Sequence, residues 1–491
     1  MTSPRSFHDP LDTRLARACA PLVQAHPGRS GVVALPDGRD AFAARALLAD
    51  AAERTLDVRY YIWHRDMSGT LLCAALRRAA ERSVRVRLLL DDNNTAGLDA
   101  VLAALDAHPN IEVRLFNPFK VRRWRLLGYL TDFQRLNRRM HNKSFTADNQ
   151  ATIIGGRNVG DEYFDAGHAP WFVDLDVLAI GPVVSDVSRD FDRYWTSASS
   201  IPAGRVLPRA TATSIAGVAA DAARVEHHPD AAAYIEALAR SSFVRDLLAH
   251  RLTFDWAGTR MLSDDPAKGL GRAPEDALLW HRLTESIGAP LRALRLVSPY
   301  FVPGRAGVEA LAAIARRGVE IAVLTNALEA TDVAVVHAGY AKRRKALLAA
   351  GIRLFELKRG PSRSPTKQVE WTGRSLGGSG SSASSLHAKT FAVDRSRVFI
   401  GSFNFDPRSA RLNTEMGFVI DSPTLADAIA ERFADEVPTR AYQVGLGDTG
   451  QLYWIDRRDG VDVVHHQEPG AGVWRRLAVA LLSLLPIEWL L

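Results

Sequence analysis

The residues best suited to catalysis occur in this sequence as two matching sets. The first set lies in HNKSFTADNQATIIGGRN (141–158) and the second in HAKTFAVDRSRVFIGSFN (387–404). In each set a histidine is followed at the same offsets by a lysine, an aspartate, a Gly-Gly or Gly-Ser pair and an asparagine. The members are His141, Lys143, Asp148, Gly155, Gly156 and Asn158, and then His387, Lys389, Asp394, Gly401, Ser402 and Asn404. So many positions repeated at fixed spacing indicate one function served by both sets.

These residue types suit displacement at the phosphorus of a phosphodiester. A phosphodiester is already anionic, so attack requires fixed donors that neutralise its non-bridging oxygens. The two lysines and two asparagines supply such donors, and the pattern calls for no metal and no other cofactor. One imidazole can attack phosphorus while the other, protonated, gives a proton to the leaving oxygen. We therefore expect the two histidines to act on a single phosphorus atom.

Each histidine also needs a partner that fixes its tautomer and stabilises its charge. Asp174 in FVDLDVLAIG and Glu415 in NTEMGFVI each begin a predicted strand after one of the motifs, and both are candidates for this role. Asp148 and Asp394 fall at predicted turns, where an aspartate commonly caps the turn. For these two residues we expect structural support.

The elements that must position the histidines are predicted to be β-hairpins. Residues i and i+2 of a strand point to the same face, so MHNKSFTAD and LHAKTFAVD would each present a histidine beside a lysine. A turn and a return strand, ATIIGG or VFIGS, would follow. The glycine or serine pair ends the return strand and allows close approach of the backbone.

The repetition extends upstream of both hairpins. Each motif is preceded by a strand, a helix and a second strand, predicted at 56–63, 68–83 and 84–92 and again at 294–303, 306–318 and 319–326. This order predicts a duplicated α/β domain. We place the first repeat at about 30–210 and the second at about 225–445, followed by a C-terminal extension at 446–491.

Composition limits the class of protein. The 491 residues are 47% hydrophobic and 24% charged, which is typical of a folded globular chain. The net charge of +7 favours an anionic partner or simply aids solubility. Two cysteines imply neither a disulfide framework nor a thiolate metal cluster. Because the first residues contain no apolar signal-peptide core, we expect a cytoplasmic location.

The paired sets resemble the HxKxxxxD signature of the phospholipase D superfamily, which is followed by a GS or GG pair and an asparagine. The resemblance covers the chain from about residue 30 to its end. It implies a duplicated phospholipase D-like α/β domain, with two mixed sheets flanked by helices in a pseudo-two-fold arrangement around one shared active site. It also implies His141 as the nucleophile and His387 as the acid and base. Gly155–Gly156 departs from the Gly–Ser pair of many members, so that half lacks a serine contact.

Finer blocks of sequence are similar to the bacterial cardiolipin synthases of the C type. These blocks are RLNRRMHNKSF, GGRNVGDEYF, TDVAVVHAGYAKRRKALL and GSFNFDPRSARLNTE. The likeness implies a phosphatidyltransferase that makes cardiolipin from phosphatidylglycerol with phosphatidylethanolamine as co-substrate. It also suggests that Asp332, His337 and Tyr340 line the lipid pocket. The catalytic residues alone do not distinguish a transferase from a phospholipid hydrolase or a nuclease.

Three further segments bear on the partner. KVRRWRLLGYLTDFQRLNRR (120–139) interleaves basic with aromatic and leucine residues, which suits an anionic lipid surface, single-stranded nucleic acid or a basic surface over a core helix. VWRRLAVALLSLLPIEWLL (473–491) is either a peripheral anchor or a packed helix. The Gly/Ser-rich segment 373–385 is either a linker or the rim of a site. The leucine content favours a phospholipid partner and a peripheral place on the inner membrane, without obligatory nucleic acid. No particular protein partner is indicated.

Overall fold

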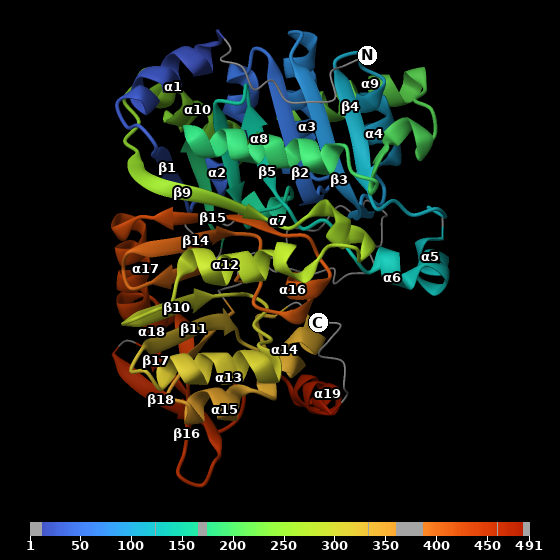
Figure 1. Ribbon diagram of the computed structural model, residues 1–491. Coiled ribbons are helices and arrows are strands. Elements are labelled where there is room, and N and C mark those ends of the chain that lie inside the picture. Colours follow the sequence, from blue (N-terminus) through green and yellow to red (C-terminus); the bar gives the residue numbers. More distant parts are fainter. Residues whose placement is uncertain are drawn as a thin grey trace.

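The computed structural model describes residues 12–122, 124–164, 174–331, 333–359, 386–458 and 460–484, and for Leu126 the backbone alone. The described chain forms two α/β halves stacked on one another (Figure 1). The first half runs from blue to green in that view, and the second from yellow to red. Each half is built on its own mixed β-sheet.

The sheet of the first half has the strand order β8-β4-β3-β2-β5-β6-β7-β1. Its strands are β1 (Ser30–Leu35), β2 (Thr55–Ile62), β3 (Arg85–Asn94), β4 (Ile111–Phe116), β5 (Ser144–Ala147), β6 (Ala151–Gly155), β7 (Asp176–Ile180) and β8 (Ser200–Pro202). Strands β2, β3 and β4 are parallel, and the other neighbours are antiparallel. Nearly every residue of the central strands is buried, as expected for strands covered on both faces.

The sheet of the second half repeats this order as β16-β12-β11-β10-β13-β14-β15-β9. Its strands are β9 (Asp255–Ser263), β10 (Ala293–Val297), β11 (Glu320–Asn326), β12 (Arg353–Leu357), β13 (Thr390–Val393), β14 (Arg397–Gly401), β15 (Met416–Asp421), β16 (Ala441–Leu446), β17 (Leu452–Arg458) and β18 (Val461–His465). The parallel and antiparallel relations match those of the first half, and β17 and β18 extend the sheet beyond β16. The predicted duplicated α/β fold is confirmed.

Strand β9 belongs to both sheets. Its first residues pair antiparallel with β1, where Ser30 lies opposite Ala257, and the rest of the strand pairs antiparallel with β15, where Ser263 lies opposite Met416. A buried apolar cluster crosses the same junction, with Val177 of the first half and Phe418 of the second among its members. Backbone pairing and apolar packing therefore both hold the halves together.

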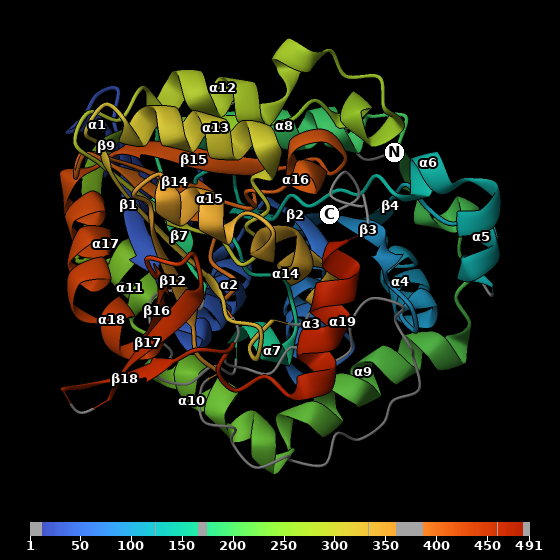
Figure 2. The same ribbon diagram turned by 90° about the horizontal axis from the view of Figure 1, so that it is seen from below.

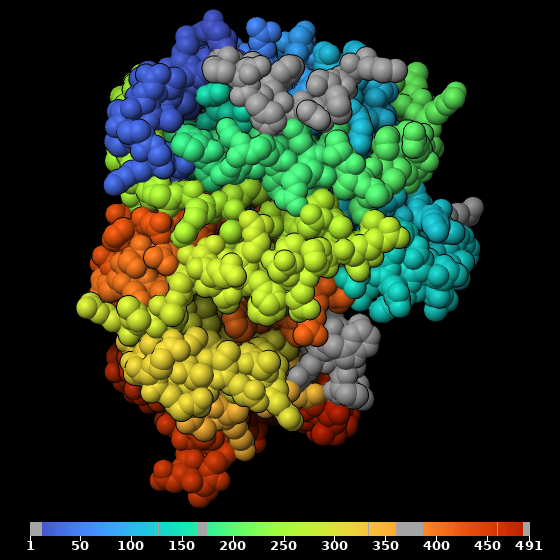
Figure 3. Space-filling view, in the orientation of Figure 1, coloured from blue at the N-terminus to red at the C-terminus, as the bar shows by residue number. Residues whose placement is uncertain are grey.

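Helices cover the sheets. Those of the first half are α1 (Arg14–Gln24), α2 (Gly38–Ala51), α3 (Met67–Glu81), α4 (Asp99–Asp106), α5 (Arg125–Thr131), α6 (Phe133–Leu136), α7 (Asp161–Phe164), α8 (Pro182–Trp195), α9 (Ala212–Glu226), α10 (Ala232–Arg240) and α11 (Phe243–Leu248). Those of the second half are α12 (Leu279–Ile287), α13 (Gly304–Ala315), α14 (Ala334–Ala341), α15 (Arg344–Ala349), α16 (Pro407–Arg411), α17 (Pro423–Asp435), α18 (Val437–Arg440) and α19 (Val473–Ser483). Short 3-10 turns add η1 (Ala203–Arg205), η2 (Pro229–Ala231), η3 (Pro266–Leu270) and η4 (Glu275–Ala277). On the face shown in Figure 3, the segment around α12 covers the junction of the halves.

Candidate active site

The two histidine stretches lie before their hairpin strands rather than on them. Strand β5 begins at Ser144 and β13 at Thr390, so the strand predicted over each His-x-Lys stretch is wrong by a few residues. The first stretch leaves the sheet because it contacts the other half of the molecule. The backbone N–H of His141 donates to the carbonyl oxygen of Thr414 at 2.8 Å. This contact brings the first motif to the junction of the halves.

Each histidine is paired with a carboxylate from the opposite half. Nδ1 of His141 lies 2.8 Å from Oε2 of Glu415, and Nδ1 of His387 lies 2.6 Å from Oδ2 of Asp174. Both carboxylates were predicted as imidazole partners, but the exchange between halves was not. A hydrogen bond from Nδ1–H to a carboxylate fixes the tautomer and leaves Nε2 as the nitrogen available to a substrate. The exchange also means that neither half holds a complete histidine pair by itself.

The lysines and aromatic rings pack closely around these pairs. Nζ of Lys143 donates to the carbonyl oxygen of His141 at 2.6 Å, and Lys389 makes the same contact with His387. A tyrosine ring meets each imidazole edge to face: Tyr61 at His141, with ring centroids 4.9 Å apart, and Tyr163 at His387, at 5.1 Å.

The motif asparagines have unused hydrogen-bonding capacity. Oδ1 of Asn158 accepts from the backbone N–H of Ile62 at 3.2 Å, whereas its buried Nδ2 has no partner among the described residues. In Asn404 the buried atom without a partner in the described chain is instead the acceptor oxygen Oδ1, so only Asn158 shows an unused N–H donor. A buried polar group left unpaired is costly unless something else satisfies it. An anionic phosphoryl oxygen would satisfy an amide N–H at this place.

Burial and neighbouring charge control protonation. Burial, with the nearby charges of Lys143, Lys389 and His387, lowers the pKa of His141 well below its usual value. These mutual effects place both motifs in one electrostatic neighbourhood. Burial and then Lys389 lower the pKa of His387. Burial also lowers the pKa of Lys143 well below its usual value.

The two carboxylates are shifted in opposite directions. Burial raises the pKa of Glu415 to about 7, against the opposing charge of Lys143. Burial also works against ionisation of Asp174, but the adjacent His387 outweighs it, and the pKa of Asp174 is lowered. At neutral pH Asp174 is therefore an anion, whereas Glu415 is only partly ionised.

The motif aspartates hold the hairpins in place. Each accepts three backbone N–H groups from the segment that leads into the neighbouring strand, β2 or β10. The donors to Asp148 are Glu53, Arg54 and Thr55, and those to Asp394 are Leu291, Arg292 and Ala293. Three charge-assisted bonds of this kind make a strong local anchor. The contacts are structural and do not reach the histidines.

The glycine and serine pairs differ between the halves. Oγ of Ser402 donates to Oε2 of Glu415 at 2.5 Å, and Ser409 donates to the other oxygen at 2.8 Å. In the first half, a Cβ at Gly156 would lie 2.1 Å from Oδ1 of Asp174. Gly155 and Gly401 are also in close contact with the neighbouring strand, because a Cβ would meet Asp176 at 2.2 Å and Met416 at 2.4 Å, respectively.

The residues suggested to line a lipid pocket fall in two groups. Asp332 lies outside the described residues. His337 and Tyr340 lie in a buried polar cluster, in which Arg344 contacts His337 at 2.6 Å and the carboxylate of Glu356 at 2.8 Å. Tyr340 donates to the same carboxylate at 3.1 Å. Both residues are therefore engaged with protein groups.

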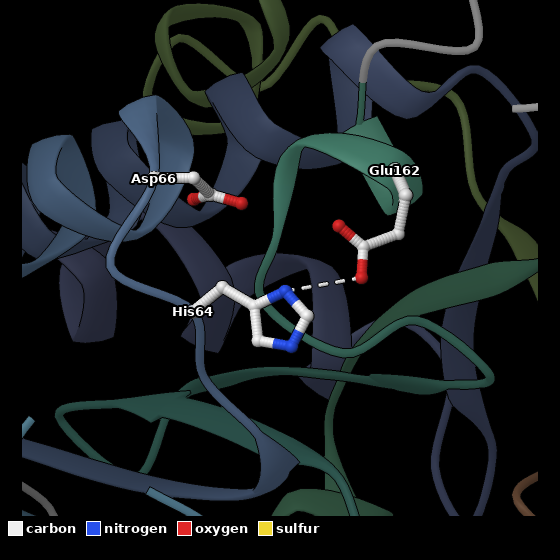
Figure 4. Close-up of side chains that lie close together, drawn as sticks. All are labelled: His64, Asp66 and Glu162. Atoms are coloured by element: carbon white, nitrogen blue, oxygen red, sulfur yellow. Dashed lines mark ion pairs between the residues drawn. The ribbon is translucent and has the colours of Figure 1, made fainter. Parts of the chain in front are cut away.

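A further group of possible metal ligands consists of His64, Asp66 and Glu162, whose ligand atoms lie within 4.8 Å of one another (Figure 4). His64 is ion-paired with Glu162 at 3.1 Å. The oxygens of Asp66 accept the N–H of Gly69 at 3.0 Å and the N–H of Asp161 at 2.7 Å, which caps α3 and fastens it to the start of α7. We therefore regard the cluster as part of the fold.

Several contributors to the site were missed in the sequence. They are Tyr61, Tyr163, Ser409 and Thr414. Tyr163 lies in GGRNVGDEYF, and Ser409 and Thr414 lie in GSFNFDPRSARLNTE, so the block similarities already pointed to these three residues. Tyr61 lies in a buried strand with no pattern that separates it from core aromatics.

The segment 120–139 exposes several apolar side chains, while two of its arginines are held in internal ion pairs. Arg122 bonds to Asp92 and Asp99 at 2.5 Å each, and Arg139 pairs with Asp91 at 3.1 Å. Four large apolar residues at α5 and α6 are exposed, namely Trp124, Leu127, Leu130 and Phe133, with Trp124 62% and Leu130 82% exposed. We call these four residues the α5–α6 apolar patch. Of the three alternatives left open by the sequence, the basic surface is weakened, because Arg122 and Arg139 are held in internal ion pairs.

The C-terminal helix α19 combines the two alternatives left open by the sequence. Val479 is buried against Leu328 and Ala338, so one face packs on α14. The opposite face is exposed, with Trp474 84% accessible. We call Val473, Trp474, Leu477, Leu481 and Leu484 the α19 apolar patch. Both views place α5, α6 and α19 towards the right-hand side of the molecule (Figures 1 and 2).

Among the described helices, none has the length and apolar character needed to span a bilayer.

Comparisons with known proteins find related domains and chains. The family model described as cardiolipin synthase, PLD-like domain, matches residues 46–195 and 283–437. Cardiolipin synthase C of Escherichia coli (strain K12) is 53% identical over 484 residues, which cover 97% of this chain and 100% of that protein. Cardiolipin synthase A of Pseudomonas entomophila (strain L48) is 26% identical over 451 residues, covering 91% of this chain and 74% of the relative. The crystal structure of phosphatidylserine synthase from Haemophilus influenzae Rd KW20 has the same fold, with a TM-score of 0.58 at 12% identity, covering 97% of this chain and 100% of that one.

Proposed function

The chain belongs to the cardiolipin synthase family with phospholipase D-like domains, and on that premise we propose that it makes cardiolipin from phosphatidylglycerol, with phosphatidylethanolamine as co-substrate. The enzyme is a phosphatidyltransferase. The observation that carries the proposal is the exchanged pairing of His141 with Glu415 and of His387 with Asp174 across the junction of the halves, which supports a single site shared by both imidazoles. We retain 30–210 and 225–445 as the bounds of the two repeats and 446–491 as the extension.

The first step transfers a phosphatidyl group to the enzyme. Nε2 of His141 attacks the phosphorus of the donor lipid, a P–N bond forms, and the bond from phosphorus to the headgroup oxygen breaks. The imidazolium of His387 gives its proton to that oxygen, so ethanolamine or glycerol leaves as a neutral hydroxyl. The lysines and asparagines of both motifs stabilise the charge on the non-bridging oxygens.

The second step releases the product. A hydroxyl of the phosphatidylglycerol headgroup attacks the phosphorus, His387 takes the hydroxyl proton, and the P–N bond to His141 breaks. The product carries two phosphatidyl groups on one glycerol, and the enzyme regains its starting protonation. Water attacking in place of the lipid alcohol would give phosphatidic acid, so transfer requires a lipid-rich, water-poor site.

We place the enzyme peripherally at the cytoplasmic face of the inner membrane, on an anionic surface. The net charge of +7 favours approach to anionic lipid, and the α5–α6 and α19 apolar patches offer side chains that can enter the headgroup region. The α5–α6 patch follows β4 and leads directly to His141, which puts it on the chain next to the chemistry. We propose no nucleic-acid partner.

One experiment separates the candidate activities. The purified full-length protein is incubated with phosphatidylglycerol vesicles, with and without phosphatidylethanolamine, and in parallel with single-stranded DNA. We expect cardiolipin by mass spectrometry, with ethanolamine released from the mixed vesicles. Phosphatidic acid as the main product would instead indicate a hydrolase, and cleaved DNA with unchanged lipid would indicate a nuclease. The His387→Ala variant serves as the control for contaminating activity.

A second experiment tests the membrane surface. Leu127→Ser/Leu130→Ser and a truncation before Trp474 should each weaken co-sedimentation with vesicles more than they slow transfer on detergent-dispersed lipid. Thr131→Ser, at the end of α5, is the matched control. Because Arg122 and Arg139 are held in internal ion pairs, the salt-sensitive part of binding should come from the net charge of +7 and not from these two arginines. Unchanged vesicle binding by both altered proteins would contradict the assignment.

A further inference from the structure

The catalytic histidines lie outside the hydrogen-bonded ladders of the sheets, and their backbone needs another anchor. Strands β5 and β13 begin three residues after His141 and His387, respectively. A segment outside a ladder has more freedom than a paired strand, yet catalysis requires reacting atoms in near-contact geometry. Something must therefore fix the chain directly before each histidine.

In the first half the backbone on either side of Met140 pairs with Thr414 of the other half, and the side chain that holds Met140 itself is that of Asp91, a fully buried residue near the end of β3. Its Oδ2 accepts the backbone N–H of Met140, the residue before His141, at 2.7 Å. The charge of the carboxylate is balanced by Arg139, whose guanidinium lies 3.1 Å from Oδ1. The carbonyl oxygen of Arg139 in turn accepts the N–H of Thr414 at 2.9 Å, next to Glu415.

In the second half the anchor is Asn326, the last residue of β11, which is also buried. Its Oδ1 accepts the backbone N–H of Leu386, the residue before His387, at 2.9 Å. Its Nδ2 donates to the carbonyl oxygen of the same residue at 3.1 Å. One side-chain amide thus holds both polar backbone groups of Leu386.

Asp91 and Asn326 occupy equivalent positions in the duplicated sheets. Asp91 lies opposite Phe116, the last residue of β4, and Asn326 lies opposite Leu357, the last residue of β12. The pairing of β3 with β2 and of β11 with β10 also makes Asp91 the counterpart of Asn326. Two different side chains therefore offer an acceptor oxygen at the same place, each to the residue that precedes a histidine.

We propose that Asp91 and Asn326 are positioning residues, which hold the backbone before each histidine and thereby set the distance from the imidazole to the phosphorus and to the carboxylate of the opposite half. The inference rests on the proposed phosphatidyl transfer for its assay. Neither residue contacts an imidazole, so the effect passes through the backbone of Met140 or Leu386. Both positions must provide an oxygen that accepts a backbone N–H, whereas a negative charge is found only at Asp91 in the first half.

Asn326 offers the cleaner test, because changing it leaves no buried charge unpaired. Asn326→Leu removes both bonds to Leu386, whereas Asn326→Asp keeps the acceptor for its N–H but loses the donor to its carbonyl oxygen and adds a carboxyl group. Thr325→Val is a buried, nearly isosteric control one residue earlier, which loses only a 3.3 Å hydroxyl bond to the carbonyl oxygen of Pro299. We expect Asn326→Leu to lower kcat by about 100-fold with little change in KM, as small displacements in an active site do. Asn326→Asp should recover part of the loss, and Thr325→Val should stay close to the unchanged enzyme.

A pH profile separates positioning from loss of structure. Asp174 supports the imidazolium of His387, so loosening their contact lowers the pKa of His387. The alkaline limb of kcat should then move to lower pH in Asn326→Leu, which a loss of folded protein would not cause. For the first half, Asp91→Asn keeps the acceptor for Met140, whereas Asp91→Leu/Arg139→Leu removes acceptor and countercharge together. The double variant should lose more activity than Asp91→Asn.

The outcomes distinguish the two proposals. If the unchanged enzyme makes no cardiolipin, the proposed function fails. If it makes cardiolipin and Asn326→Leu works as fast as Thr325→Val, the positioning role is overturned. A loss of kcat equal to the loss of folded protein by circular dichroism, with an unmoved pH profile, also overturns it.

Discussion

His141 contacts Glu415 in the same way that His387 contacts Asp174. The two carboxylate side chains differ in length and in their other hydrogen bonds, and the two imidazoles differ in exposure. Glu415 is longer by one methylene and receives the hydroxyls of Ser402 and Ser409. Asp174 is shorter, and its carboxylate fills the space that a Cβ at position 156 would need. The imidazole of His387 is 23% exposed and that of His141 is 9% exposed.

This difference indicates that, in each half, the carboxylate and the residue at the second position of the glycine or serine pair are matched in size. A serine beside a glutamate and a glycine beside an aspartate are two ways to place a carboxylate oxygen against an imidazole. The Gly155–Gly156 pair is therefore matched to Asp174 and is no defect of the motif. The more exposed His387 is also better placed to exchange protons with leaving and entering alcohols, which agrees with its proposed acid and base role.

We expect the largest loss of activity when either imidazole is removed from its carboxylate. His141→Ala and His387→Ala should each lower cardiolipin formation by at least about 10³-fold, and the double variant should be no worse, because the two groups act as a unit. Mass spectrometry of the product and peptide mapping of a trapped adduct provide the measurement. We expect the phosphatidyl group on His141. An adduct on His387 would reverse the assigned roles, and near-normal product from either variant would end the shared-site interpretation.

The next prediction is that substitutions of the two carboxylates lower activity with different pH dependence. Because Asp174 is anionic throughout the working range, Asp174→Asn should cost about 10³-fold at every pH tested. Glu415 becomes anionic only as pH rises through its pKa of about 7. Glu415→Gln should therefore cost about tenfold below pH 6 and about 100-fold above pH 8. Parallel pH–rate profiles for the two variants would contradict the difference in charge state.

A smaller effect tests the matched neighbours. Gly156→Ser should displace Asp174 and lower kcat by about 100-fold. Ser402→Ala removes one hydroxyl from the Glu415 carboxylate, and losing such a bond costs about 1.5–3 kcal/mol, or roughly ten- to 100-fold.

Steady-state kinetics on mixed lipid vesicles would compare the two substitutions. Gly217→Ser in α9, where a Cβ has open space, is the control for the added side chain. Full activity of Gly156→Ser would show that position 156 tolerates the motif's usual serine.

The last contrast concerns stability and not activity. The pKa of Glu415 is raised by folding, so stability falls as pH rises from the ordinary value towards 7 and stays lower above it. Glu415→Gln should thus gain up to about 3 kcal/mol at pH 8 and little at pH 5. The shift of Asp174 has the opposite sign, so Asp174→Asn should lose stability above pH 4. Thermal unfolding at both pH values measures the contrast, and a destabilised Glu415→Gln at pH 8 would refute it.

Much of the fold could be predicted because both halves repeat the same pattern. Alternating strands and helices predicted the parallel core, as β2, β3, β10 and β11 show. Histidine, lysine and asparagine at fixed spacing led to the proposed chemistry at phosphorus, which stays a prediction. Asp174 and Glu415 were predicted as imidazole partners because each begins a strand after one of the motifs. In the structure each lies against an imidazole.

The remaining features depend on contacts between distant segments. The exchange of carboxylates across the junction leaves no trace in local periodicity. The arginines at 122 and 139 read as surface charges until Asp91 and Asp92 are placed beneath them. His141 was expected on a strand, but its hydrogen bond to Thr414 of the other half overrides the local preference.

Strand β9 has a consequence for how this molecule can be divided. A chain cut in the loop after α12 would leave β9 on the first piece, whereas the ladder partner of most of its length, β15, would lie on the second. The second piece alone would carry an unpaired, apolar sheet edge and would need the first as a strand donor to cover it. The duplicated halves therefore cannot be regarded as two independent modules joined by a tether, although their strand orders are the same.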